Sequence, residues 1–275
     1  MKHCPEQSTG FAGSFPISLR QLSEPVFPSL SPAPPPAPSP LTILGPGVDL
    51  WLRSDLRIRT SQGKVTYWGD SSGRNNDLAF RAAGPLQDLD SPSYSPSGGP
   101  NGTPAVVFDG IDDSLLNITL TFALPFYYWA VIEQVSWTDG RICWIALDFA
   151  LVIGQIAQLG LGFGSPNLVQ GNGTANLFNL NSNQAGTIGS FFRLEASFTN
   201  SVADYFKIHA TNATGKNSGG NQDGQRGFRL AASQSSSAHA NIAVVELVKF
   251  RGTPTPAQRA ALDAYGSARY GVGVL

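Results

Sequence analysis

Short segments in which apolar residues alternate with polar ones, or form brief apolar runs, recur along the chain from Val48 onward. Gly, Asn, Asp and Ser separate these segments, and this combination predicts β-strands joined by turns. The predicted strands are VDLWLR, KVTYWGD, PAVVFDG, SLLNITLTF, YYWAVIEQV, RICWIALDF, QLGLGFG, ANLFNL, FFRLEASFT, DYFKIHAT, GFRLAAS and NIAVVELVKF. About a dozen strands without helices between them indicate a β-sandwich or barrel.

The last predicted element has the pattern of an amphipathic helix. Thr255 is a suitable N-cap, Pro256 fits the first turn, and Gln258 completes a Thr-x-x-Gln capping box. Apolar residues then follow at helical spacing, namely Ala261, Leu262, Tyr265 and Ala268. Gly271 is a suitable stop. We expect this C-terminal helix to pack on the sandwich.

The N-terminal residues have a different composition. Closely spaced prolines in residues 24–46 favour an extended polyproline II spacer. Before the spacer, a polar tract carries apolar residues that it is too short to bury by itself, namely Phe11, Phe15, Ile17, Leu19 and Leu22. These residues either belong to a disordered tail or become ordered on a partner or a sister subunit. The sequence therefore predicts an extended N-terminal arm at residues 1–44 and one β domain at residues 45–275.

Charge and hydropathy exclude several classes of partner. The formal net charge is −1 and charged residues make up 13% of the chain, so no basic surface is available for a nucleic acid backbone. The chain has no apolar run of about 18 residues, the length of a membrane span, and its first residues lack the apolar core of a signal peptide. We expect neither nucleic acid binding, membrane insertion nor signal-peptide export. Cys4 and Cys143 lie in unlike settings, which predicts two free thiols.

Three blocks of the sequence together resemble concanavalin A-like, laminin-G-like jelly-roll modules of the kind found in phage virion and bacterial surface proteins. Residues 50–80 are similar to the opening strand, hairpin and Trp-x-Asp turn of these modules. Residues 101–116 are similar to a strand that ends in Phe-Asp-Gly before an acidic turn, and residues 244–272 to the closing strand and terminal helix. The resemblance implies an all-β fold, an antiparallel sandwich of the jelly-roll type with one C-terminal helix. It says little about function, because lectins, glycan hydrolases, adhesins and structural modules share this architecture.

Most residues that carry the resemblance have a structural interpretation. Trp51, Trp68 and Phe108 lie on predicted strands, and we expect them in the core. Short polar side chains in the predicted turns are expected to bond to nearby backbone, namely Asp70, Asn75, Asn76, Asp109 and Asp112.

The acidic turn also carries a weak candidate metal site. Asp109, Asp112 and Asp113 offer hard oxygen ligands close together, and the resemblance to a fold that often binds calcium implies Ca²⁺. The turn lacks a recognised calcium-loop code. We therefore expect no cofactor, with Ca²⁺ as the alternative, and no change in thermal stability on addition of EDTA.

The sequence does not assemble a catalytic site. Glycan hydrolases of this fold need two carboxylates facing one cleft, and a Glu-x-Asp-x-Glu strand, which would place alternate acids on one face, is absent. Glu133, Glu195 and Glu246 are isolated on their strands. The three histidines lack metal-ligand spacing, and neither a nucleophile elbow nor a phosphate loop occurs. We predict a non-enzymatic protein, although acids from different strands leave a hydrolase open.

Two non-enzymatic functions remain. The first is a virion structural protein, such as a phage decoration, fibre or tail-surface subunit, made in the host cytoplasm and displayed on the virion surface. Its arm would bind other virion proteins or sister subunits in a homo-oligomer. The alternative is a free carbohydrate-binding module or adhesin. The two overlap, because a displayed module can bind host glycans.

Candidate glycan-binding residues lie in predicted loops rich in sugar-compatible side chains. Trp137, Asp139 and Arg141 belong to the turn SWTDGR, and Asn172 and Asn181 to neighbouring Asn-rich loops. The alternative for the turn is an ordinary hairpin that uses its Asp-Gly pair to join two strands.

Overall fold

A computed structural model describes much of the β domain. The described residues are 38–80, 90–122, 125–136, 145–146, 158–161, 169–173, 178–182, 188–198, 205–208, 211–214, 216–217, 225–232 and 239–271. The chain divides into two compact units, Met1–Pro36 and Ala37–Leu275. All described residues belong to the second unit, so the apolar residues predicted for the arm, Phe11, Phe15, Ile17, Leu19 and Leu22, lie outside them.

The second unit is built from antiparallel strands, as the sequence predicts. The strands are β1 (Val48–Arg53), β2 (Ile58–Ser61), β3 (Lys64–Trp68), β4 (Leu78–Ala79), β5 (Ser93–Ser95), β6 (Ala105–Asp109), β7 (Leu115–Phe122), β8 (Phe126–Gln134), β9 (Ile145–Ala146), β10 (Gln158–Leu161), β11 (Val169–Gly173), β12 (Phe178–Ser182), β13 (Phe191–Phe198), β14 (Tyr205–Ile208), β15 (Thr211–Thr214), β16 (Lys216–Asn217), β17 (Gln225–Leu230) and β18 (Asn241–Arg251). The helices are α1 (Pro40–Leu44), η1 (Gly45–Gly47), η2 (Pro100–Gly102) and α2 (Pro256–Tyr270).

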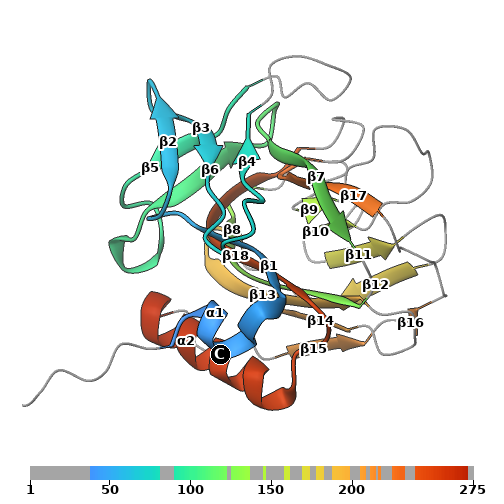
Figure 1. The fold of residues 1–275 in the computed structure, drawn as a ribbon. Coiled ribbons are helices and arrows are strands. Elements are labelled where there is room, and N and C mark those ends of the chain that lie inside the picture. Colours follow the sequence, from blue (N-terminus) through green and yellow to red (C-terminus); the bar gives the residue numbers. More distant parts are fainter. Residues whose placement is uncertain are drawn as a thin grey trace, which may run out of the picture. The chain divides into compact units, whose positions relative to one another are not determined.

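The long strand β18 organises the sheet (Figure 1). Its first half pairs with β6 and its second half with β1, while β8 pairs along its other side. Beyond β8 the pairing continues to β13 and β14. In the other direction it continues from β6 through β5, β3, β4 and β7 to β17. The sheet thereby curls over itself into a sandwich, and Tyr128 of β8 lies 6.2 Å from Phe228 of β17 between ring centres.

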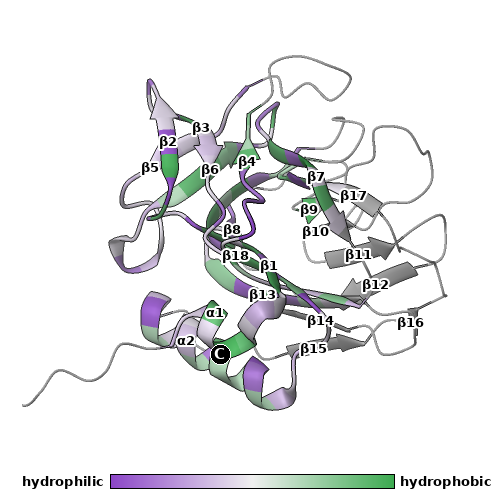
Figure 2. Ribbon diagram, viewed as in Figure 1, coloured by the Kyte–Doolittle hydropathy of each residue, from purple (hydrophilic) through white to green (hydrophobic). Residues whose placement is uncertain are grey.

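Both faces of β8 are buried, and each contributes to a different core. The inner core, between the two halves of the curled sheet, takes Phe126, Tyr128, Ala130 and Ile132 from this strand. The second core takes the alternate residues Tyr127, Trp129 and Val131 and packs them under the helices. The alternation follows from the period of two residues in a strand. Figure 2 shows in green the apolar residues of the curled sheet and of α1.

The predicted aromatic core residues are confirmed, and so is the turn role predicted for Asp70, whereas the Asn76 side chain donates to the distant Asp49 carbonyl at 2.7 Å. Trp68 and Phe108 are fully buried in the inner core, and Trp51 is buried in the second core. Asp70 shapes its turn, because its carboxylate accepts hydrogen bonds from the Ser72 amide at 2.8 Å and the Asn76 amide at 3.0 Å.

Helix α2 begins and ends as predicted. The Thr255 hydroxyl accepts from the Gln258 amide at 3.2 Å, and the Gln258 side chain accepts from the Thr255 amide at 2.9 Å. Gly271 caps the C-terminus with a left-handed φ of 62°. The buried residues are Leu262, Tyr265, Gly266 and Tyr270.

The predicted apolar face of α2 needs one correction, because Ala268 is exposed. Ala268 lies on the solvent side of the helix, and Tyr270 takes the buried position in the last turn. Helix α1, which the sequence pattern did not predict, packs against α2, and the Gln258 amide group donates to the Ile43 carbonyl at 3.1 Å. Among the described residues, no helix has the length and apolar character of a membrane span.

Candidate functional site

A shallow groove of about 300 Å³ opens beside β4 and β7. These two strands pair through Ala79 and Leu116. The residues that line the groove are Asp77, Ala79, Phe80, Leu116, Asn117, Ile118 and Thr119. The groove therefore combines aliphatic and aromatic surface with a carboxylate, an amide and a hydroxyl.

A bulge lies in the part of β7 that lines the groove. The pairing of β7 with β17 shifts between Asn117 and Thr121, which face Phe228 and Arg226. The Asn117 side chain holds the bulge, because its Oδ1 accepts from the Thr119 amide at 2.8 Å and the Leu120 amide at 2.7 Å. Bulges of this kind redirect side chains out of the regular alternation of a strand.

The bulge joins β7 to the turn before β4 and leaves an aliphatic side chain in solvent. Asn117 Nδ2 donates to the Asp77 carbonyl at 2.9 Å. Ile118 is 46% exposed, and Phe80 is partly buried. The floor of the groove is thus a fixed apolar surface that remains accessible to a ligand.

Asp77 borders this apolar surface and connects it to two polar residues that do not line the groove, Arg57 and Tyr67. The Asp77 carboxylate accepts from the Asp70 amide at 2.7 Å and lies 3.7 Å from an Arg57 guanidinium nitrogen. A hydrogen bond to Asp77 raises the pKa of the Tyr67 hydroxyl. Because Asp77 and Arg57 are 25% and 45% exposed, they retain capacity to bond to a ligand. An apolar surface with a few convergent polar groups is typical of a small-molecule site.

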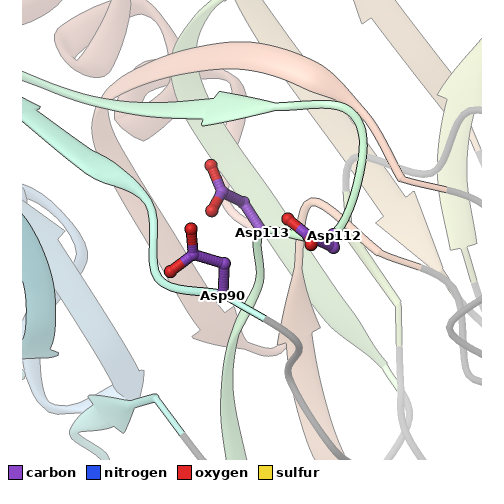
Figure 3. A group of neighbouring side chains, drawn as sticks. All are labelled: Asp90, Asp112 and Asp113. Atoms are coloured by element: carbon purple, nitrogen blue, oxygen red, sulfur yellow. The ribbon is translucent and has the colours of Figure 1, made fainter.

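A second polar cluster joins Asp90, Asp112 and Asp113, whose ligand oxygens all lie within 4.8 Å of one another (Figure 3). The predicted metal ligands were Asp109, Asp112 and Asp113. The structure brings the last two together but adds Asp90 in place of Asp109. The Asp109 carboxylate instead accepts from the Ile111 amide at 2.8 Å and so shapes the turn.

Burial dominates the electrostatics of this cluster. Asp113 is 1% exposed, and loss of hydration raises its pKa to about 6, although a hydrogen bond from the Asp109 amide at 3.0 Å opposes the shift. Lys64 Nζ lies 2.9 Å from an Asp90 oxygen and 3.8 Å from Asp113 Oδ1. The lysine thus pairs closely with Asp90 and only loosely with Asp113.

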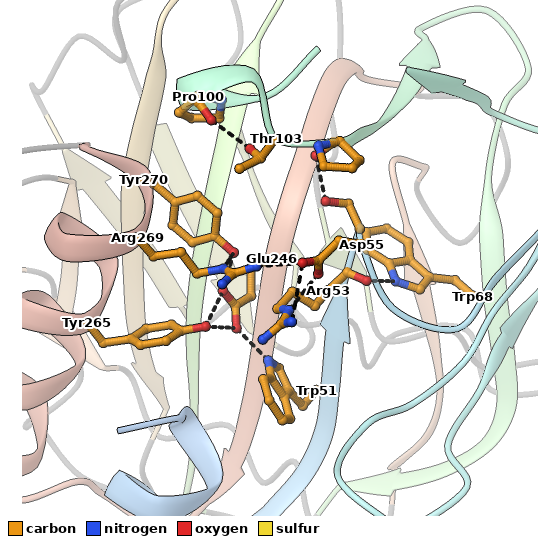
Figure 4. A network of polar contacts seen from close by, with 12 residues as sticks. Trp51, Arg53, Asp55, Trp68, Pro100, Thr103, Glu246, Tyr265, Arg269 and Tyr270 are labelled. Carbon is orange, nitrogen blue, oxygen red and sulfur yellow. Dashed lines mark hydrogen bonds and ion pairs between the residues drawn. The ribbon is translucent and has the colours of Figure 1, made fainter. Parts of the chain in front are cut away.

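The acid Glu246, which the sequence leaves isolated, belongs to a buried network between β18 and α2 (Figure 4). The Tyr265 hydroxyl lies 3.0 Å from both carboxylate oxygens, and Trp51 Nε1 and the Tyr270 hydroxyl also donate to them. Burial raises the pKa of Glu246, and these hydrogen bonds oppose the increase. The carboxylate is fully buried, so it serves to hold α2 on the sheet and does not face a cleft.

The glycan-binding residues predicted from the sequence are only partly described. Trp137, Asp139 and Arg141 lie outside the described residues, as do Cys4 and Cys143. Asn172 and Asn181 were predicted in loops, but the structure places them in strands β11 and β12. There they pair with Asn179 and Gln170, because backbone pairing with neighbouring strands overrides the turn preference of Asn.

No protein-family model and no curated protein matches the chain. Several solved structures are similar to it. One is domain 4 of AbnA, a GH43 extracellular arabinanase from Geobacillus stearothermophilus, in complex with arabinotriose, with a TM-score of 0.60 and 12% identity over 77% of this chain and 95% of that domain.

Two further structures belong to larger enzymes. A GH54 arabinofuranosidase complexed with arabinofuranosyl-α-1,2-xylobiose has a TM-score of 0.55 and 17% identity, over 77% of this chain and 51% of that one. Trypanosoma rangeli sialidase in complex with sialic acid has a TM-score of 0.54 and 11% identity, over 84% of this chain but 34% of the sialidase. At these identities the similarity concerns the fold. The described unit is a β domain similar in fold to domains of carbohydrate-active proteins.

Proposed function

We propose that the chain is a carbohydrate-binding module and that the groove beside β4 and β7 is its ligand site. The observation that carries the proposal is the exposed apolar floor of the groove, formed with Phe80 and Ile118 and bordered by the Asp77 carboxylate. The fold similarity to an arabinanase domain in complex with arabinotriose supports the same function.

The groove offers the two kinds of contact that a sugar ring needs. Phe80 and Ile118 would pack against the C–H face of the ring, since burying apolar surface is favourable. Asp77 would accept from sugar hydroxyls, and so would the Thr119 hydroxyl oxygen, whose proton is donated to Asn117 Oδ1 at 3.0 Å. Arg57, the ion-pair partner of Asp77, would donate to them. Because the groove is shallow and open, we expect single-site dissociation constants in the micromolar to millimolar range, about −8 to −4 kcal/mol.

Two experiments test the site. A glycan array is first probed with a multivalent form of the protein, and titration calorimetry then measures the affinity for arabinotriose. We expect Phe80→Ala and Ile118→Ala each to weaken binding by about tenfold, which corresponds to the loss of about 1.4 kcal/mol of apolar contact. Ile111→Ala is the matched control, because Ile111 is 74% exposed and does not line the groove. It should leave the affinity unchanged.

Two results would contradict the proposal. One is the absence of any glycan signal from the folded, multivalent protein. The other is glycan binding that survives Phe80→Ala and Ile118→Ala unchanged, which would place the ligand elsewhere on the molecule.

The virion role stays a prediction that depends on the composition of the arm. It is compatible with glycan binding, because a module displayed on a particle could use the same groove for host glycans. Mass spectrometry of purified particles would separate the two, since a virion component is present at fixed stoichiometry. The homo-oligomer and the absence of catalysis likewise stay predictions.

A further inference from the structure

The face of the sheet that carries the groove extends over β3 and β2. Across neighbouring strands, Arg59 pairs with Tyr67, Tyr67 with Ala79, and Ala79 with Leu116. Residues that pair directly across antiparallel strands point to the same face of a sheet. Because Ala79 and Leu116 line the groove, Tyr67 and Arg59 lie on the face of the groove, one and two strands beyond Ala79.

The opposite face of these strands belongs to the core. Trp68 and Leu78 pair with each other on β3 and β4, and both are fully buried in the inner core. On the face of the groove, by contrast, Arg59 is exposed and Tyr67 is only partly buried. A ligand in the groove can therefore extend across β3 towards Arg59.

Tyr67 connects Arg59 to the groove. The guanidinium carbon of Arg59 lies 4.6 Å from the centre of the Tyr67 ring, a distance at which a cation is attracted to the face of an aromatic ring. The Tyr67 hydroxyl forms a hydrogen bond with Asp77, which lines the groove. The ring thus holds the Arg59 guanidinium beside the groove.

The two arginines near Tyr67 differ in how their charge is used. Arg57 lies 3.7 Å from the Asp77 carboxylate and also donates to the Asp70 carbonyl. It packs closely against the chain, because a Cβ atom at Gly69 would lie 2.7 Å from Arg57 Nε. Among the residues that the structure describes, no carboxylate forms an ion pair with Arg59. The charge of Arg59 is therefore available to a ligand.

We propose that the glycan bound in this groove is acidic and that a carboxylate of one of its sugars binds Arg59. This inference rests on the proposed function, because it names the class of glycan for the same groove. A guanidinium group presents its donors in a planar fork that matches the two oxygens of a carboxylate. A neutral sugar offers no charged partner to that fork.

The distance between the two contacts indicates more than one sugar. Neighbouring strands lie about 4.8 Å apart, so the backbone at Arg59 is about 10 Å from that at Ala79, two strands away. Two linked sugar rings span such a distance. One ring would pack on Phe80 and Ile118, and the next would direct its carboxylate to Arg59.

Titration calorimetry of the full-length chain with two acidic oligosaccharides tests the inference. Trigalacturonate represents the uronic acids and 3′-sialyllactose the sialic acids, and the methyl ester of each has the same sugars without the charge. We expect at least one acid to bind about fivefold or more tightly than its own ester. This preference should shrink as the salt concentration rises, because exposed charges are screened.

Variants of Arg59 assign the preference to this side chain. Arg59→Gln should abolish the preference for the acid, whereas Arg59→Lys should retain part of it, because lysine keeps the charge but not the fork. The affinity for arabinotriose should be unchanged in both, since Arg59 does not line the groove. Arg74→Gln is the matched control, because this exposed arginine donates to the Pro46 carbonyl at 2.6 Å and does not line the groove either. It should leave the preference intact.

The inference is overturned if each ester binds as tightly as its acid, if arabinotriose binds but neither acid does, or if Arg59→Gln keeps the preference. In these cases binding of arabinotriose that depends on Phe80 and Ile118 would still support the proposed function. If none of these glycans binds, the proposed function itself is contradicted.

Discussion

At the scale of single residues, the acid Glu246 serves packing. Its carboxylate lies between β18 and α2 and accepts from Trp51, Tyr265 and Tyr270. Burial raises its pKa above the ordinary value, while these three donors and the nearby Arg53 charge oppose the increase. A raised carboxyl pKa means that the native state holds this proton more tightly than the unfolded chain does.

The stability of the protein therefore depends on pH. The free energy of unfolding should fall as pH rises from the ordinary Glu pKa of about 4.3 through the raised value. Glu246→Gln has no proton to lose, so it should flatten this part of the profile. Urea unfolding at a series of pH values measures the effect. As a control, Glu133→Gln should flatten the pH profile less, because Glu133 is only partly buried. An unchanged profile in Glu246→Gln would contradict the account.

At the scale of elements, α2 lies close to the sheet because one of its buried residues has no side chain. A Cβ atom at Gly266 would lie 2.9 Å from Trp129 Cζ2, closer than such atoms approach in proteins. The rigid indole is itself buried in the second core. Gly266 is therefore required by packing, although glycine weakens a helix.

We predict that Gly266→Ala destabilises the protein by about 1–3 kcal/mol, because overpacking outweighs the gain in helix propensity of about 1 kcal/mol. Chemical denaturation gives the free energy of unfolding. Ala268→Ser, on the exposed side of the same helix, should change it by less than about 0.5 kcal/mol. A stabilised Gly266→Ala protein would show that α2 is not held against Trp129.

The elements differ in how far the sequence predicts them. Residues 255–258 specify the start of α2 by local hydrogen bonding, and a short apolar run specifies strands such as β8, so both can be predicted from the sequence. The polar Asn117 within an apolar segment is a signal for the bulge in β7, although the pattern of this segment predicts a regular strand. Asp90 joins Asp113 only through tertiary pairing, so no local pattern could add it to the acidic turn.

At the scale of the whole molecule, the β domain should fold without the arm. The compact unit begins at Ala37, and α1 contributes the buried Leu44 to the core under α2. A chain that begins at Ala37 should unfold cooperatively with nearly the stability of the full chain. A chain that begins at Gly45 should be less stable by about 1.5–3 kcal/mol, the contribution of a buried leucine. Equal stability of the two truncated chains would show that α1 contributes nothing.

NMR spectroscopy tests most directly the claim that the groove beside β4 and β7 binds glycans. The isotope-labelled β domain is titrated with the glycan that binds best on the array, and the shifts of its backbone amides are mapped. The account predicts saturable shifts concentrated at Phe80, Asn117, Ile118 and Thr119, with the amide of Ile111 unchanged. Shifts confined to the turn that contains Trp137 and Arg141, or none at all, would contradict it.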